Sequence, residues 1–124
     1  MNNDCIFCQI ANKELPKQLH YESDLVVAFD DLHKDAPEHV VIISKKHIAT
    51  LNDALPADRL ILGELLLAAS QIAAKLKIDQ SGYRCLINTG ANGGQVIQHL
   101  HLHLVGGRPL GPLLTKSIAS SGLN

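Results

Sequence analysis

Apolar residues occur along the chain in patterns that predict both strands and helices. Short, largely apolar runs predict strands at residues 25–29, 40–43 and 83–88. Apolar residues at helical spacing follow Pro56 and continue to Lys77, which predicts one long helix. A shorter helix is expected at residues 6–13. Strands on both sides of one long helix, mostly joined by short turns, favour an α+β fold with a largely antiparallel sheet.

The strictest alternation of polar and apolar residues lies near the C-terminal end. His99, His101 and His103 alternate with leucines, and the run continues into Val105. This period predicts a strand over residues 95–105 with the imidazoles on one face, roughly 6.7 Å apart, and the leucines on the other. The leucines would pack against a core, which leaves the histidine face for a ligand, a metal or a substrate. We therefore expect the chemistry on this strand.

The length of 124 residues favours a single domain over residues 1–124. Its core is expected at about residues 5–113, with a loosely ordered tail at 114–124. The helix at residues 56–77 is apolar around much of its circumference, and one sheet cannot cover all of it. Its second face is predicted to form a homodimer contact, and burial under the C-terminal tail is the alternative.

Composition excludes some partners. A net charge of −1 and few aromatic residues, two Tyr, two Phe and no Trp, disfavour a nucleic-acid polymer. The N-terminus lacks the regions of a signal peptide, and the longest mostly apolar stretch, residues 60–74, is too short to span a membrane. We expect a cytoplasmic protein that does not bind membranes. Three cysteines in that compartment argue against disulfides and make Cys5 and Cys8 a candidate metal or redox pair.

A nucleophilic histidine requires a neutral ring nitrogen aimed at the electrophile and a second group that fixes its tautomer. His101 is the central imidazole of the alternating run, and both of its histidine neighbours could serve in this way. Upstream, Gly93 and Gly94 could let backbone N–H groups approach a phosphate, with Asn88 and Gln95 as further donors. No Walker-type loop is present, so phosphate chemistry would run without its lysine.

The run at residues 99–105 resembles the defining motif of the histidine triad (HIT) family, His-φ-His-φ-His-φ-φ with φ apolar. The resemblance covers about residues 5–113 and is carried, in the family's order, by residues 29–32, 36–39, 44–47, 82–88, 93–95 and 106–109. Residues 108–112 resemble the bacterial members of its nucleoside phosphoramidase branch, often called Hint. The resemblance implies a HIT-like sheet of about five strands, one long helix and a short N-terminal helix.

The resemblance also implies a homodimer that binds purine mononucleotides and hydrolyses nucleoside phosphoramidates such as adenylated amines. His101 would attack the α-phosphorus to form a nucleotidyl-histidine, and water would then release the nucleoside monophosphate. His103 would contact the phosphate and the leaving group, while His39 and His99 complete the catalytic set. The family's chemistry requires no cofactor.

Further residues fall where the family contacts its substrate. Asp31 would bind the ribose hydroxyls. The base would be enclosed by Phe7, Ile10, Phe29 and Leu32. The ribose and phosphate would be surrounded by Asn88, Gly94 and Gln95. Val96 replaces a polar residue common beside the leaving amine, and Gln98 replaces a frequent aromatic, so both departures bear on leaving-group preference.

A structural zinc site is implied by the same resemblance, because members with this cysteine pair look zinc-bound. The ligands would be Cys5, Cys8, His47 and His99. Such a closed site leaves no position for water, so it would serve stability. The alternative is that the cysteines are small residues on a terminal helix.

Two other functions compete with the phosphoramidase. A zinc hydrolase could use His-x-His as metal ligands, although the chain has no His-x-His-x-Asp-His pattern. A nucleotide-binding interaction or regulatory module could have only incidental catalysis. An adduct trapped on His101 would favour the phosphoramidase over the zinc hydrolase, whereas tight nucleotide binding with negligible turnover would select the interaction module.

Overall fold

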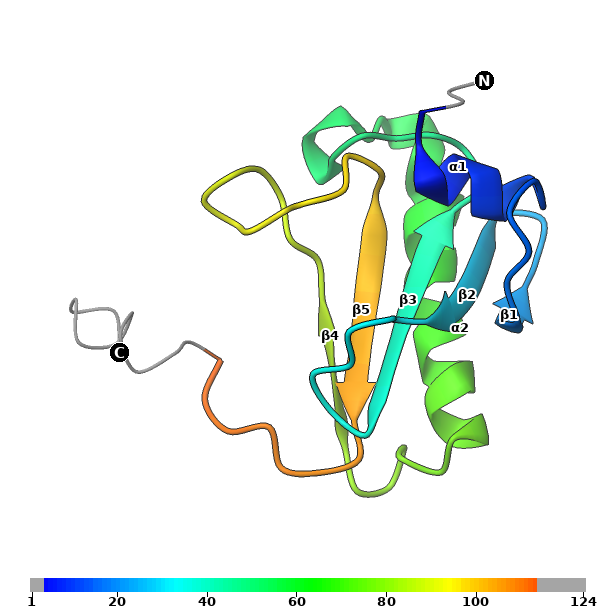
Figure 1. Cartoon of the computed structure of the whole chain (residues 1–124). Coiled ribbons are helices and arrows are strands. Elements are labelled where there is room, and N and C mark those ends of the chain that lie inside the picture. The colour runs from blue at the N-terminus through cyan, green and yellow to red at the C-terminus, as the bar shows by residue number, and fades with distance from the viewer. Residues whose placement is uncertain (1–3, 114–124) are drawn as a thin grey trace.

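A five-stranded antiparallel sheet forms the centre of the fold, with a long helix on one face and a short helix on the other (Figure 1). The computed structural model describes residues 4–113. The strands are β1 (Leu19–Glu22), β2 (Val26–Asp30), β3 (Glu38–Ser44), β4 (Tyr83–Leu86) and β5 (His101–Gly106), in the spatial order β1-β2-β3-β5-β4. The helices are α1 (Ile6–Ala11) and α2 (Arg59–Lys75). The predicted α+β fold is therefore confirmed, whereas the expected tail at 114–124 lies outside the described residues.

Helix α2 covers one face of the sheet with a regular apolar stripe. Ile61, Leu65, Ala68 and Ile72 are buried at helical spacing against alternate residues of the sheet, such as Ile42. The helix begins three residues later than Pro56 because residues 56–58 form a short 3₁₀ turn. No helix among the described residues has both the length and the apolarity needed to cross a bilayer.

The opposite face of the sheet carries a second buried cluster. Val27 and Phe29 of β2 and Val41 and Ile43 of β3 point to this face and pack with the side chains of α1. Residues 39–44 are all buried because β3 has a core on each side. The central strands therefore read as continuous apolar runs, which explains why the sequence predicts them.

The prediction of a strand over residues 95–105 is wrong for residues 95–100. Residues 95–100 follow a turn at residues 90–94 and contain only a bend at residues 97–99, and β5 begins only at His101, which pairs with Ile43 of β3. Instead of a ladder bond, the Leu100 N–H donates to the Ile48 carbonyl at 2.6 Å. His99 therefore precedes the strand. The strand predicted at 83–88 likewise ends at Leu86, where its pairing with His103 ends.

Candidate active site

The ring of His101 is held in one orientation by a backbone carbonyl. His101 lies at the start of β5, is 7% exposed, and places Nδ1 2.6 Å from the carbonyl oxygen of His99. A carbonyl can only accept, so in the neutral ring Nδ1 carries the hydrogen and Nε2 carries the lone pair. Phe7 packs edge-on against the ring, with centroids 5.1 Å apart. His101 thus presents an oriented nucleophilic nitrogen.

His39 and His103 form a chain of hydrogen bonds with a defined direction. The Asp35 backbone N–H donates to His39 Nδ1 at 3.1 Å. His39 Nδ1 is therefore the acceptor, so His39 Nε2 carries a hydrogen and donates to His103 Nδ1 at 2.9 Å. The remaining hydrogen of a neutral His103 is then on Nε2. This chain aims an N–H donor from His103 beside the nucleophile, since the rings of His101 and His103 are 4.9 Å apart.

The carboxylate of Asp31 stands beside this pair of histidines. Its Oδ2 is 3.5 Å from His39 Nε2 and 3.8 Å from His103 Nδ1, while its Oδ1 accepts the His33 backbone N–H. Burial lowers the pKa of His103 to about 4, helped by the neighbouring His101 and His39, and Asp31 acts in the opposite direction. His103 is therefore neutral at pH 7 when no anion is bound.

The four predicted metal ligands lie together beneath the start of β5. His99 donates from Nε2 to the Ser44 carbonyl at 2.7 Å, so its Nδ1 lone pair faces Cys5 Sγ at 3.2 Å and Cys8 Sγ at 3.6 Å. His47 Nδ1 is 3.2 Å from Cys8 Sγ. All four ligand atoms lie within 4.8 Å of one another. Tetrahedral zinc keeps neighbouring S and N ligands about 3.3–3.8 Å apart, so these residues fit zinc closely.

The glycine-rich loop before β5 is held together by two of the predicted substrate contacts. The Asn88 side chain donates to the Gly93 carbonyl, and a Cβ on Gly93 would lie 2.4 Å from the Thr89 carbonyl oxygen. The Gln95 side chain accepts the Gly90 N–H at 3.0 Å and also donates to two backbone carbonyls. Both amides therefore hold the loop, a role that the sequence did not predict for them.

The residues expected to enclose the base are only partly brought together. Phe7, Ile10 and Phe29 are buried in one cluster, with the two phenyl rings edge-to-face and 5.7 Å apart. Leu32 is instead 82% exposed and Val96 is 88% exposed. Gly94 is also exposed and has a φ of 80°. Phe7, Ile10 and Phe29 thus form a buried apolar cluster whose Phe7 ring packs against His101. Leu32 stands at the surface, as do Gly94 and Val96, which were expected beside the phosphate and the leaving amine.

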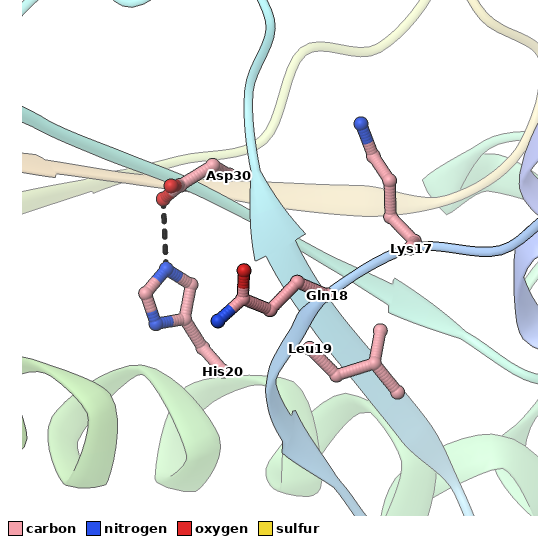
Figure 2. A pocket seen from close by; sticks show the side chains of 5 residues that line it. All are labelled: Lys17, Gln18, Leu19, His20 and Asp30. Carbon is pink, nitrogen blue, oxygen red and sulfur yellow. Dashed lines mark hydrogen bonds and ion pairs between the residues drawn. The ribbon is translucent and has the colours of Figure 1, made fainter.

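A separate cavity of about 210 Å³ lies at the start of β1, where the sequence indicated no site (Figure 2). His20 Nε2 is 2.7 Å from Asp30 Oδ1, and Lys34 Nζ is 3.5 Å from the other carboxylate oxygen. Asp30 follows Phe29 on β2, so it points to the face opposite to that of the Phe29 ring. These pairs are partly exposed, and such pairs contribute little to stability.

The groups that fix the histidine tautomers were missed by sequence reasoning. They are backbone atoms: the Asp35 N–H, the Ser44 carbonyl and the His99 carbonyl. Any residue type could supply them, so no sequence pattern signals their role. Arg84 and Arg108 lie in segments of the family pattern, and both line a cavity that also contains His103.

Comparison with known proteins agrees with this geometry. The family model described as HIT domain matches residues 12–110. The chain is 42% identical over 114 residues to the purine nucleoside phosphoramidase of Escherichia coli K12, covering 92% of this chain and 96% of that protein. A histidine triad protein from Clostridium difficile superposes with a TM-score of 0.88 at 38% identity, covering 92% of this chain and 99% of that one. A HIT family hydrolase from Legionella pneumophila gives 0.83 at 42% identity, covering 86% and 95%. The chain therefore belongs to the histidine triad (HIT) family.

Proposed function

We propose that this protein is a purine nucleotide-binding hydrolase that cleaves nucleoside phosphoramidates through a nucleotidyl group on His101. The observation that carries the proposal is the 2.6 Å hydrogen bond between His101 Nδ1 and the His99 carbonyl, which leaves Nε2 as the nucleophile. The name of the Escherichia coli relative supports the same reaction.

In the first half-reaction, His101 Nε2 bonds to the α-phosphorus while the P–N bond of the substrate breaks. The electron pair of that bond leaves with the amine nitrogen, which takes a proton from His103. An anionic phosphate beside His103 Nε2 would favour the protonated imidazole, so substrate binding would raise the pKa of His103. The added Nδ1–H of the protonated ring would then donate to the Asp31 carboxylate in place of accepting from His39. His103 then has the proton that the leaving amine requires.

In the second half-reaction, a water molecule attacks the phosphorus and the bond to His101 breaks. The water gives one proton to His103, which restores the acid, and the hydroxyl becomes part of the nucleoside monophosphate. His101 returns to its neutral form because Nε2 regains its lone pair when the bond to phosphorus breaks, while the hydrogen stays on Nδ1 and donates to the His99 carbonyl throughout. The net reaction consumes one water and releases the amine and the nucleotide.

For substrate binding, we propose that the purine stacks on the wall formed by Phe7, Ile10 and Phe29. The ribose hydroxyls would donate to Asp31, whose carboxylate oxygens have lone pairs beyond those used within the chain. The phosphate and the outer edge of the nucleotide would be contacted by Leu32, Asn88, Gly94, Gln95 and Val96.

Incubation with an adenosine 5′-phosphoramidate, followed by intact-mass measurement, tests the mechanism. His103→Asn lacks both the acid of the first half-reaction and the base of the second. With adenosine 5′-(p-nitrophenyl) phosphate, whose leaving group departs without a proton, this variant should therefore accumulate protein heavier by one adenylyl group. A His101→Asn variant should show neither adduct nor turnover, while AMP binding persists. Turnover by His101→Asn would refute the mechanism, and tight nucleotide binding without turnover in the wild type would favour the interaction-module alternative.

We also propose that Cys5, Cys8, His47 and His99 bind a structural zinc ion. The fit of the donor atoms supports this site, and so does the His99 Nε2–H bond to Ser44, which fixes Nδ1 as the ligand. Zinc would clamp α1 against the strand that carries the nucleophile, and its bound charge would stabilise the thiolates. A reducing compartment, the cytoplasm, would keep both thiols available.

A homodimer is the last part of the proposal. Leu60, Leu66 and Leu67 on the outer side of α2 are each more than half exposed. An exposed apolar helix face of this kind is suited to a second copy of the chain. We further propose that residues 1–124 form one domain.

A further inference from the structure

A cavity of about 330 Å³ opens on one flank of His103. Its lining includes Arg84, Leu86, Asn88, His103, Arg108 and Leu110. The cavity lies over the histidine face of β4 and β5 and reaches His39 at the start of β3, whereas Phe29, part of the proposed base wall, is on β2, two strands away from β5. A nucleotide bound against Phe29 would therefore leave this cavity to whatever is attached beyond the phosphate.

The register of β4 against β5 places Arg84 on the histidine face of the sheet. Leu86 pairs directly with His103, and Arg84 pairs with Val105. Side chains of directly paired residues share a face, so Arg84 and Leu86 project on the same side as His103. Arg84 is the diagonal neighbour of His103, a separation of about 7–8 Å that an arginine side chain can span.

Both arginines bring positive charge that no carboxylate in the described part of the chain neutralises by an ion pair. Arg84 donates to the Gly111 carbonyl at 2.7 Å, and Arg108 donates to the carbonyls of Asp35 and Pro109. Each guanidinium has five N–H donors, so both retain donors for a ligand. The Asp35 side chain is the acidic group of the lining, and the two arginines outnumber it.

We propose that Arg84 and Arg108 form a carboxylate-binding subsite for the leaving group, so that the preferred substrates are nucleoside phosphoramidates of amino acids. This inference rests on the proposed function, because the amine departs beside His103. Arginine binds carboxylates through paired hydrogen bonds, and the aliphatic side chains of Leu86 and Leu110 would contact the short stem between amine and carboxylate.

Two substrates with the same skeleton test the subsite. They are the adenosine 5′-phosphoramidates of β-alanine and of β-alaninamide, which differ only in the charge of the terminal group. We expect wild-type kcat/KM to favour the carboxylate by about tenfold or more, the factor typical of one charge-assisted hydrogen bond. Arg84→Met and Arg108→Met should each move this ratio toward one. The exposed Arg59 at the start of α2 supplies the matched control, and Arg59→Met should keep the wild-type ratio.

The possible failures can be distinguished. A wild-type ratio of one, with both substrates hydrolysed, overturns the subsite and leaves the proposed function standing, even where an arginine variant fails to fold. No hydrolysis of either substrate, or of unsubstituted adenosine 5′-phosphoramidate, overturns the proposed function and the subsite together. If the arginine variants weaken AMP binding by the same factor as carboxylate turnover, the arginines bind the nucleotide phosphate and the subsite is refuted.

Discussion

Substituting His39 with asparagine or with glutamine removes one or the other of the two hydrogen bonds that the His39 ring makes. The side-chain oxygen of asparagine lies near the position of His39 Nδ1, so His39→Asn keeps an acceptor for the Asp35 N–H and loses the donor to His103. The side-chain amide of glutamine reaches the position of Nε2, so His39→Gln keeps the donor and loses the acceptor. The pair therefore tests whether His39 acts on His103 or only on the loop at Asp35.

The length and burial of each hydrogen bond indicate how much kcat or stability each variant should lose. The bond from His39 to His103 is 2.9 Å long, is buried at its His39 end, and positions the neutral His103 ring. A hydrogen bond between neutral groups contributes about 0.5–1.5 kcal/mol, which corresponds to a fall in kcat of about 2- to 12-fold for His39→Asn. Loss of the bond to Asp35 in His39→Gln should instead cost about 1 kcal/mol of stability, with a smaller effect on kcat.

Steady-state hydrolysis of an adenosine phosphoramidate and urea unfolding measure the two effects on the same preparations. His33 is exposed, and only its backbone N–H, not its ring, bonds to Asp31, so His33→Asn and His33→Gln are matched controls with no expected change in kcat. Wild-type kcat in His39→Asn, or a larger loss of kcat in His39→Gln than in His39→Asn, would refute the directed chain from Asp35 to His103.

Three further predictions follow from other parts of the fold. Protein purified without added zinc should contain near-stoichiometric zinc that Cys5→Ser/Cys8→Ser loses, and a metal-free wild type of undiminished thermal stability would rule the site out. Burial holds the folded-state pKa of His103 at about 4, below its usual 6.5, so its contribution to stability is present above pH 6.5 and lost as the pH falls toward 4. Urea unfolding should therefore show a steeper loss across that window for the wild type than for His103→Gln, and equal slopes would contradict the burial argument. Leu66→Glu should dissociate a wild-type dimer in light scattering, whereas a wild type that is monomeric at micromolar concentration would remove the proposed interface.

The sequence predicted the elements whose pattern reflects direct burial. Strand β3 and helix α2 pack through continuous or regularly spaced apolar residues, so their positions were recoverable within a few residues. Strand β1 was not predicted, because its four residues are only partly buried on an edge and include His20 and Glu22. Strand β1 takes its conformation from pairing with β2, and this pairing leaves little trace in so polar a run. The other edge strand, β4, was predicted because its run is largely apolar.

The candidate site divides in a similar way. Alternation along β5 correctly placed His101 and His103 on one face, because both lie within the paired ladder. His99 departs from the pattern because its ring makes long-range contacts with Ser44 and with the two cysteines, and these contacts outweigh strand geometry. The exposure of Leu32 could not be foreseen either, since it depends on the path of the loop after β2.

His99 links the cysteine cluster to His101, the proposed nucleophile, through its side chain and its backbone carbonyl. Its ring is fixed by Ser44 on one side and faces Cys5 on the other, so the cluster determines where the residue sits. Its carbonyl accepts from His101 Nδ1, so the position of the same residue determines the tautomer of the nucleophile. A strand extended through residue 99 would place this ring beside that of His101 and would turn the carbonyl toward a neighbouring strand. The late start of β5, at His101, is therefore what allows one histidine to face the proposed metal ligands with its side chain and to orient the proposed nucleophile with its backbone.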